Sequence, residues 1–291
     1  MSISKRHFLD KFSETLIKLA GLLSVMILVG ILFLLLTNGL SFFKFYQIKI
    51  FFKGNFWNPL ESFSILPLLL GTVYTSLFAM VIAIPVSILS AAYIIEFAPK
   101  WIKTVSQPVI ELLASVPSVI IGFWGITVVG PFICKIFKTH SGLNLLNGSI
   151  LLASMILPTI ISISQDAIYA VPQKLKEASY ALGANKFQTL FFVTIPTASP
   201  GLIAACLLGF GRAIGETMIV LMVTGNVPMI PSRITDSIRT ITSTIAIELG
   251  EVPYNTSHYF ALFSIALFLF AISLSINMMV EYIVYQIRKY Q

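Results

Sequence analysis

Two ionisable residues, Arg212 and Glu216, stand in a stretch that is otherwise almost entirely apolar, ACLLGFGRAIGETMIVLMV at residues 205–223. An arginine at the centre of a membrane helix costs about 2.5–3.5 kcal/mol, so Arg212 must face protein or water. Its guanidinium carries a fork of N–H donors that matches the oxygens of an oxyanion. On one helix Glu216 follows Arg212 by four residues and can neutralise it until an anion arrives. We therefore expect a substrate-pathway pair, with an ion pair that only fixes helix geometry as the alternative.

The same predicted helix carries a stripe of small residues. Gly201, Ala205 and Gly209 share this stripe with Arg212 and Glu216 at a period of 3.6 residues. Small side chains let another helix, or a solute, approach the backbone closely.

The composition predicts an integral membrane protein. Of 291 residues 57% are hydrophobic and only 11% are charged, whereas about 25% of the residues of a soluble domain are charged. Each of six apolar runs reaches the roughly 20 residues that a spanning helix needs. The expected fold class is therefore an all-α bundle of six transmembrane helices, at residues 15–37, 66–95, 107–133, 149–171, 199–224 and 259–285.

Pro117 and Pro158 fall inside two of these predicted spans. A proline removes a backbone N–H donor and clashes with the preceding turn, so we expect a kink or a break at each. Most such kinks in membrane helices serve packing alone.

The charge distribution and the cysteines exclude several classes of site. The net charge of +7 is scattered over every loop, which indicates contact with lipid headgroups rather than a nucleic-acid site. Two cysteines, Cys134 and Cys206, provide no disulfide framework and no metal cluster. Lys and Arg favour a cytoplasmic location of both termini by only ten to seven.

The segment between the fourth and fifth spans is amphipathic. Its charged residues alternate at helical spacing with apolar ones, and Gly183 interrupts the pattern. We expect two short helices with a positive φ at Gly183. A helix lying passively on the headgroups is the simpler alternative.

This segment resembles the EAA loop of type I ABC importer permeases, whose pattern is E-A-A, three residues, G, nine residues and I-x-L-P. In this chain the pattern begins with Glu177, Ala178 and Ser179, continues with Gly183, and has Pro196 as its last residue. The resemblance implies a cytoplasmic loop, residues 172–198, that couples to an ATPase through Glu177, Ala178, Gly183 and Pro196. It also implies that both termini are cytoplasmic and that the protein lies in the cell inner membrane.

Three further stretches are similar to the PstC type of phosphate-uptake permease: ELLASVPSVIIGFWG at 111–125, GRAIGETMIVLMVTGN at 211–226 and RTITSTIAIELGE at 239–251. The resemblance implies a heterodimer with a PstA-type permease, a PstB-type ATPase dimer and a PstS-type periplasmic phosphate-binding protein. The chain has no G-x-x-x-x-G-K-S/T loop. We therefore expect a transport subunit that is not an enzyme and binds no cofactor or metal, with ATP and magnesium held by the partner.

The expected organisation is a first helix and periplasmic connection at 1–65, a permease core at 66–285 and a cytoplasmic tail at 286–291. Alternatives are transport of another oxyanion, such as sulfate or molybdate, and the PstA-type role. A remote one is an intramembrane hydrolase that uses Ser115, Ser118 or Ser162. Its weakness is that no histidine lies in a predicted span to serve as the base, because the three are at positions 7, 140 and 258.

Overall fold

The computed structural model describes residues 3–44, 46–59 and 62–289, with side chains between Phe12 and Gln286. The predicted tail at 286–291 therefore lies largely outside the described side chains. Helices dominate, and β pairing in the described residues is limited to two isolated bridges. The helices are α1 (Ile3–Phe42), α2 (Ile48–Lys53), α3 (Leu66–Ala92), α4 (Lys100–Ser115), α5 (Ser118–Trp124), α6 (Gly130–Phe137), α7 (Leu145–Tyr169), α8 (Gln173–Ala181), α9 (Lys186–Thr189), α10 (Ile195–Ile214), α11 (Met218–Val223), α12 (Ile241–Glu248) and α13 (Ser257–Lys289), with π-helical turns η1 (Tyr93–Phe97), η2 (Gly125–Val129) and η3 (Leu190–Thr194).

Within the described residues, six helical stretches are long and apolar enough to span a membrane, which confirms the predicted number. They are Phe12–Phe42, Leu66–Phe97, Ser118–Phe137, Leu145–Tyr169, Lys186–Ile214 and Ser257–Gln286.

Two of the predicted spans have the wrong extent. The run at 107–133 is not one helix, because the chain leaves helical geometry at Val116 and Pro117 between α4 and α5. The run at 199–224 ends at Ile214, and the short helix α11 follows a turn. In both places the sequence is continuously apolar although the helix is interrupted.

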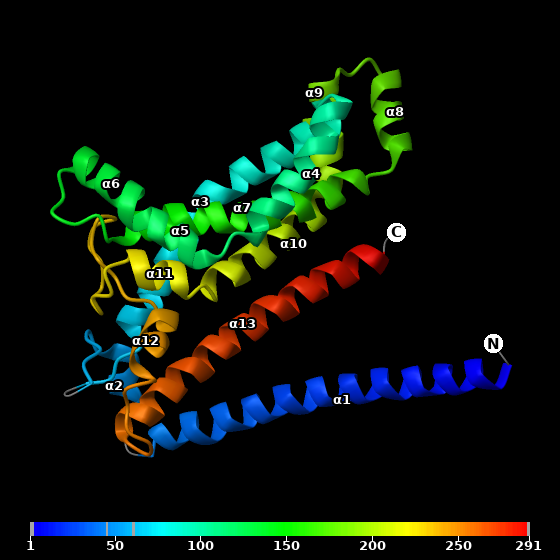
Figure 1. Cartoon of the computed structure of the whole chain (residues 1–291). Coiled ribbons are helices and arrows are strands. Elements are labelled where there is room, and N and C mark those ends of the chain that lie inside the picture. The colour runs from blue at the N-terminus through cyan, green and yellow to red at the C-terminus, as the bar shows by residue number, and fades with distance from the viewer. Residues whose placement is uncertain (1–2, 45, 60–61, 290–291) are drawn as a thin grey trace.

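The centre of the bundle is formed by α3, α7 and α10, which lie side by side in Figure 1. Small and branched apolar side chains fill the space between them, for instance Ala79, Ile156 and Ala205. The N-terminal end of α1 and the C-terminal end of α13 lie at the same end of the molecule as α8 and α9 (Figure 1). Helices α2, α6, α11 and α12 lie at the other end. The N-terminal end of α1 and the C-terminal end of α13 are thus on the side of the EAA loop.

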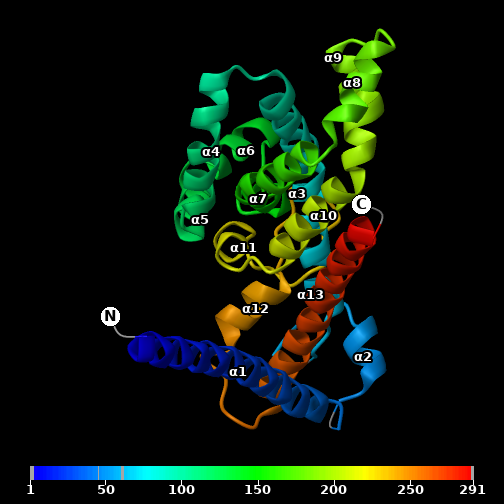
Figure 2. The same cartoon turned by 90° about the vertical axis from the view of Figure 1, so that its right-hand side faces the viewer.

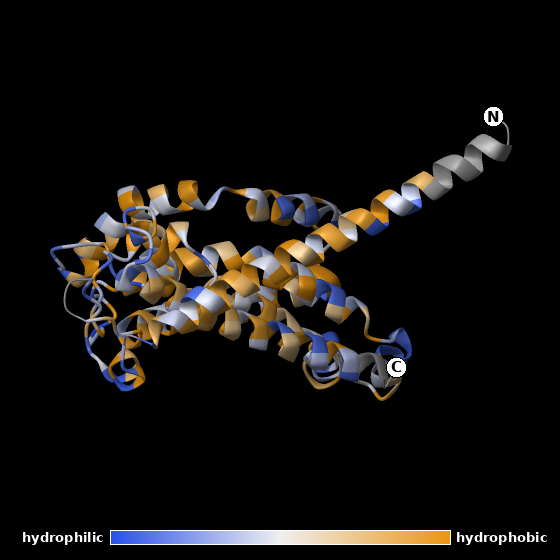
Figure 3. Cartoon of the chain, turned by 90° about the horizontal axis from the view of Figure 1, so that it is seen from below, coloured by the Kyte–Doolittle hydropathy of each residue, from blue (hydrophilic) through white to orange (hydrophobic). Residues whose placement is uncertain are grey.

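Helix α1 runs apart from the rest of the bundle (Figure 2). None of its most apolar window is buried within this chain. It meets α13 near its end, where Gly39 lies against Phe263 and Leu267 and its carbonyl accepts a hydrogen bond from Ser264 Oγ at 2.7 Å. Apolar residues run along the lengths of the helices, and hydrophilic ones gather at the two ends of the bundle (Figure 3).

Gly71 in α3 packs closely against the backbone of the segment before α12. A Cβ atom at this position would lie 2.3 Å from the carbonyl oxygen of Arg239, a backbone atom that cannot move aside freely. The contact explains why α3 carries a glycine within its first two turns, where helix propensity alone disfavours it.

We predict that Gly71→Ala destabilises the protein by about 1–3 kcal/mol, because the added methyl group forces the backbones of α3 and residue 239 apart. Thermal unfolding of the detergent-solubilised protein measures this. Gly30→Ala is the matched control: Gly30 also lies in an apolar helix, but a Cβ there meets nothing within 4 Å. Equal stability of the two variants would show that the contact is unimportant.

Candidate functional site

Arg212 lies in the last turn of α10, where its positive charge interacts favourably with the helix dipole. Its Nη1 donates a hydrogen bond to the hydroxyl of Thr159 on α7 at 2.8 Å. No ion pair of the described residues includes Arg212, and its side chain is exposed in this chain. The guanidinium is therefore positioned by a neutral hydroxyl and keeps N–H donors for another ligand.

The small-residue stripe of α10 packs on α7. A Cβ at Gly201 would lie 2.6 Å from that of Ala167, and a Cβ at Gly209 would lie 2.6 Å from Ile160. The close approach predicted for another helix is confirmed, and the helix belongs to this chain. This packing brings Arg212, at the end of the stripe, to Thr159.

The predicted pairing of Arg212 with Glu216 is wrong. The helix ends at Ile214, so the two residues are not four apart on one helical face. Glu216 turns instead toward α11, where its Oε1 accepts hydrogen bonds from the backbone N–H groups of Met218 at 3.0 Å and Ile219 at 3.2 Å. Its side chain is buried and satisfies donors that have no partner within the helix. Glu216 therefore stabilises the turn and does not neutralise Arg212.

The start of α12 holds this turn from the other side. Thr242 donates a hydrogen bond from its hydroxyl to the backbone carbonyl of Glu216 at 2.7 Å. The backbone N–H of Ile241 donates in turn to the hydroxyl of Thr72 on α3 at 3.0 Å. The turn that follows Arg212 is thus linked through α12 to α3. We call residues 212–217 the charged turn.

A buried carboxylate, Glu248, organises the end of the bundle opposite the EAA loop. It accepts from Arg239 Nη1 at 2.6 Å and from Trp57 Nε1 at 3.0 Å, and its Oε2 lies 2.7 Å from His258 Nε2. The four residues come from the connection after α2, from α12 and the segment before it, and from α13. The sequence analysis missed this cluster, because Trp57 lies 191 residues from Glu248 and no local pattern joins them.

The loop between α11 and α12 lies against the start of α7. Its carboxyl group at Asp236 is only slightly buried, and burial acts to raise its pKa, but hydrogen bonds from the backbone N–H groups of Arg233 and Ser232 lower that pKa below its ordinary value. The carbonyl of Asp236 also accepts from the backbone N–H of Leu145 at the start of α7. These contacts fasten the loop to the bundle.

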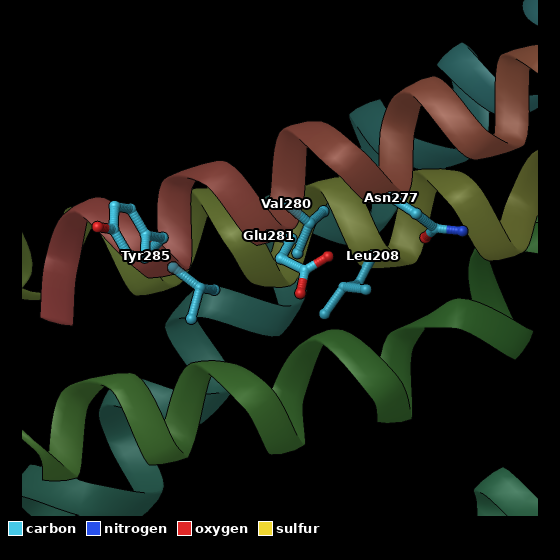
Figure 4. A pocket seen from close by; sticks show the side chains of 6 residues that line it. Leu208, Asn277, Val280, Glu281 and Tyr285 are labelled. Atoms are coloured by element: carbon cyan, nitrogen blue, oxygen red, sulfur yellow. The ribbon is translucent and has the colours of Figure 1, made fainter. Parts of the chain in front are cut away.

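A hollow of about 350 Å³ lies between α10 and α13. Leu208, one turn before Arg212, lines it together with Asn277 and Glu281 of α13, and Figure 4 shows these side chains beside one another. None of the described residues that line the hollow is basic. The described lining therefore supplies no cation that would hold an anion.

The EAA loop has the predicted form of two short helices. Helix α8 ends at Ala181, Gly183 has a φ of +87°, and α9 begins after Asn185, whose side chain caps it together with Gln188. The residues predicted to couple to an ATPase are all exposed: Glu177, Ala178, Gly183 and Pro196. Leu182 and Phe187 beside them are 91% and 63% exposed. An apolar surface of this kind is typical of a docking site.

The two prolines at which a kink or a break is predicted lie in different settings. Pro117 is the residue that precedes α5, at the break between α4 and α5. Pro158 is buried inside α7, which continues through it without interruption.

In the described residues, the hydrogen bonds of Ser115 and His258 do not join a serine to a histidine. The hydroxyl of Ser115 donates to the carbonyl of Leu112, and His258 contacts Glu248. Within the described residues no group of three His, Cys, Asp or Glu side chains is placed to hold a metal ion.

Comparison with known proteins gives a consistent result. A family model described as a binding-protein-dependent transport system inner membrane component matches residues 83–289. The chain is 39% identical over 273 residues to the probable ABC transporter permease protein YqgH of Bacillus subtilis, which covers 92% of this chain and 86% of that protein. It is 34% identical over 263 residues to the phosphate transport system permease protein PstC of Xylella fastidiosa, covering 83% and 81%.

Solved structures share the fold. A chain of a bacterial ABC transporter involved in the import of alginate superposes with a TM-score of 0.59 at 15% identity, covering 97% of this chain and 99% of that one. A chain of the MetNI methionine ABC transporter gives 0.56 at 22% identity, covering 77% and 94%. With its six spans, its EAA loop and these relatives, the chain belongs to the family of binding-protein-dependent transport system inner membrane components, the permeases of ABC importers.

Proposed function

We propose that the chain is the permease subunit of an ATP-driven importer that moves inorganic phosphate across the cytoplasmic membrane. The observation that carries this proposal is the state of Arg212, an exposed guanidinium in the last turn of a membrane helix, bonded to one hydroxyl. A guanidinium cannot face hydrocarbon without a large cost, so its exposed side faces protein or a water-filled pathway. Its donors match the oxygens of phosphate.

The relatives support phosphate as the anion. The Xylella fastidiosa protein named PstC is a phosphate transport system permease, and it aligns over most of both chains. We further propose that the chain pairs with a PstA-type permease, receives phosphate from a PstS-type binding protein and is driven by a PstB-type ATPase dimer that holds ATP and magnesium. This chain is then the half of the pathway that contributes Arg212.

The exposed EAA loop supports the coupling role. Its apolar residues Leu182 and Phe187 remain largely exposed in the described part of the chain, and the two short helices are joined by the turn at Gly183. The N-terminal end of α1 and the C-terminal end of α13 lie on the same side as this loop (Figure 1). With the ATPase in the cytoplasm, both termini are cytoplasmic.

We predict that Arg212→Gln lowers phosphate uptake by about ten- to hundredfold, since charge-assisted hydrogen bonds contribute about 1.5–3 kcal/mol each. Uptake of labelled phosphate into cells or proteoliposomes measures this, together with co-purification of the partner subunits. Arg212→Lys keeps the charge but loses the planar fork and is expected to be intermediate.

The matched control is Arg233→Gln, because Arg233 is an exposed arginine of the loop before α12. It is expected to transport normally. Normal phosphate uptake by Arg212→Gln contradicts the pathway role of this residue. Uptake of sulfate or molybdate in place of phosphate by the unmodified importer contradicts the assignment of the anion.

We predict that Gly183→Pro abolishes coupling. Gly183 has a φ of +87°, and proline fixes φ near −65°, so the turn between α8 and α9 cannot form. The protein is expected to insert into the membrane, while phosphate-stimulated ATP hydrolysis by the assembled importer is lost.

Gly183→Ala serves as the graded control. A Cβ at this position meets nothing within 4 Å, so alanine suffers only the left-handed backbone cost of about 1–2 kcal/mol. It is expected to retain much of the stimulation. Full stimulation of ATP hydrolysis in Gly183→Pro rules out the loop as the coupling element.

A further inference from the structure

The EAA loop is tied to α3 by a buried ion pair. Lys176 Nζ of α8 lies 2.6 Å from Glu96 Oε1 of η1, the π-helical turn that ends α3, and the two side chains are only 9% and 17% exposed. Pairs so withdrawn from water are directional, and they are costly to break because the remaining charge stays buried. Most exposed surface pairs hold much more weakly.

A second contact joins the same two parts. The ring of Phe97, next to Glu96, packs against that of Phe187 of α9 with centroids 4.8 Å apart. The hydroxyl groups of Ser179 in α8 and Thr189 in α9 are 2.9 Å apart, which binds the two helices of the loop to each other. The turn η1 therefore contacts both α8 and α9, and these two helices also contact each other.

The EAA loop is joined covalently to two of the three central helices, α7 and α10, but not to α3. The EAA loop follows α7 and leads through η3 into α10, so covalent bonds transmit its displacement to both helices. Helix α3 has no such connection, since Glu96 and Lys176 are 80 residues apart. The ion pair and the ring contact provide one.

The other end of α3 is linked to the charged turn through the start of α12. Leu66–Phe97 forms one stretch of 32 residues, about 48 Å long at 1.5 Å per residue. At its far end Thr72 holds the backbone N–H of Ile241, and Thr242 in the next position holds the carbonyl of Glu216. A displacement of α3 along its axis is therefore applied to the segment that positions the turn after Arg212.

We propose that Glu96 and Lys176 are positioning residues that impose the movement of the EAA loop on α3, and that α3 delivers this movement to the charged turn. This inference rests on the proposed function only in that an ATPase moves the loop. A tie that merely holds the loop in place has no effect at the opposite end of the bundle, and this difference makes the proposal testable.

The experiment follows the charged turn during the ATPase cycle. Cys134 and Cys206 are first replaced by alanine, and Met218→Cys places a thiol at the first residue of α11, where the native side chain is 45% exposed. The assembled importer is reconstituted in nanodiscs, and the rate of maleimide labelling is compared without nucleotide and after trapping with ATP and vanadate. Coupling between sites typically corresponds to about 5- to 150-fold effects, so we expect labelling to change by at least about fivefold.

Variants of the ion pair then test the link. Glu96→Gln is expected to lose most of this change while the ATPase still co-purifies, and the exchanged pair Glu96→Lys with Lys176→Glu is expected to restore it. If the exchanged pair fails to assemble, the neutral pair Glu96→Gln with Lys176→Gln leaves no stranded charge and is expected to assemble without the response. Glu14→Gln is the matched control, because Glu14 pairs with Lys18 on the surface of α1.

Several results would overturn the proposal. They are an unchanged labelling response in Glu96→Gln or in the neutral pair, release of the ATPase by Glu96→Gln, and the absence of any response in the unmodified pair. Phosphate takes no part in this assay. Failure of the phosphate assignment appears separately, as ATP hydrolysis that does not respond to a phosphate-loaded binding protein.

Discussion

Inside a bilayer no water is available to satisfy a backbone N–H or C=O group, so every interruption of a helix has to be repaired by the protein itself. The described bundle has such interruptions, and several of them have an identifiable partner. Glu216 accepts from the first N–H groups of α11, and Thr72 accepts from the start of α12. Asn147 of α7 donates to the carbonyls of Gly125 and Gly142, on either side of α6. Most of the buried polar residues near the charged turn are explained by this requirement.

This constraint separates Arg212 from the charged residues that are buried or paired within the bundle. Glu248 is surrounded by three donors, and Lys176 and Glu96 neutralise each other. Glu216 is held by backbone N–H groups. Arg212 has a hydroxyl as its described partner and remains exposed. A group that the fold positions but does not neutralise is well suited to meet a transient anion, because no internal ion pair has to be broken first.

At each end of the bundle, a buried group of charged residues joins segments that are far apart in the sequence. Glu248 joins segments that are far apart in the chain at one end, and Glu96 with Lys176 does so at the other. Helix α3 touches both regions, through Thr72 near its start and through η1 at its end. Polar interactions of this kind fix the relative position of helices more sharply than apolar contacts, which allow sliding in a membrane where lipid competes equally well for apolar surface.

Hydropathy and local motifs in the sequence determined the class and much of the outline of the fold. Long apolar runs have to become helices in a membrane, so the number of spans was predictable. The break at Gly183 was predictable for a local reason, because a glycine in an amphipathic pattern supplies a positive φ at little cost. The close packing of Gly201 and Gly209 on another helix followed from their spacing. The EAA spacing by itself indicates the family to which the chain belongs.

Only the tertiary structure decided how the charged residues are partnered. Helical spacing places Glu216 beside Arg212, but α10 ends at Ile214, and the free N–H groups of α11 provide a better partner for the carboxylate. Thr159, Glu96 and Glu248 took no part in the predicted sites, because their partners lie 53, 80 and up to 191 residues away. Local sequence reports the conformational preferences and burial of a segment, whereas the pairing of buried charges depends on which segments the packing of α3, α7 and α10 brings together.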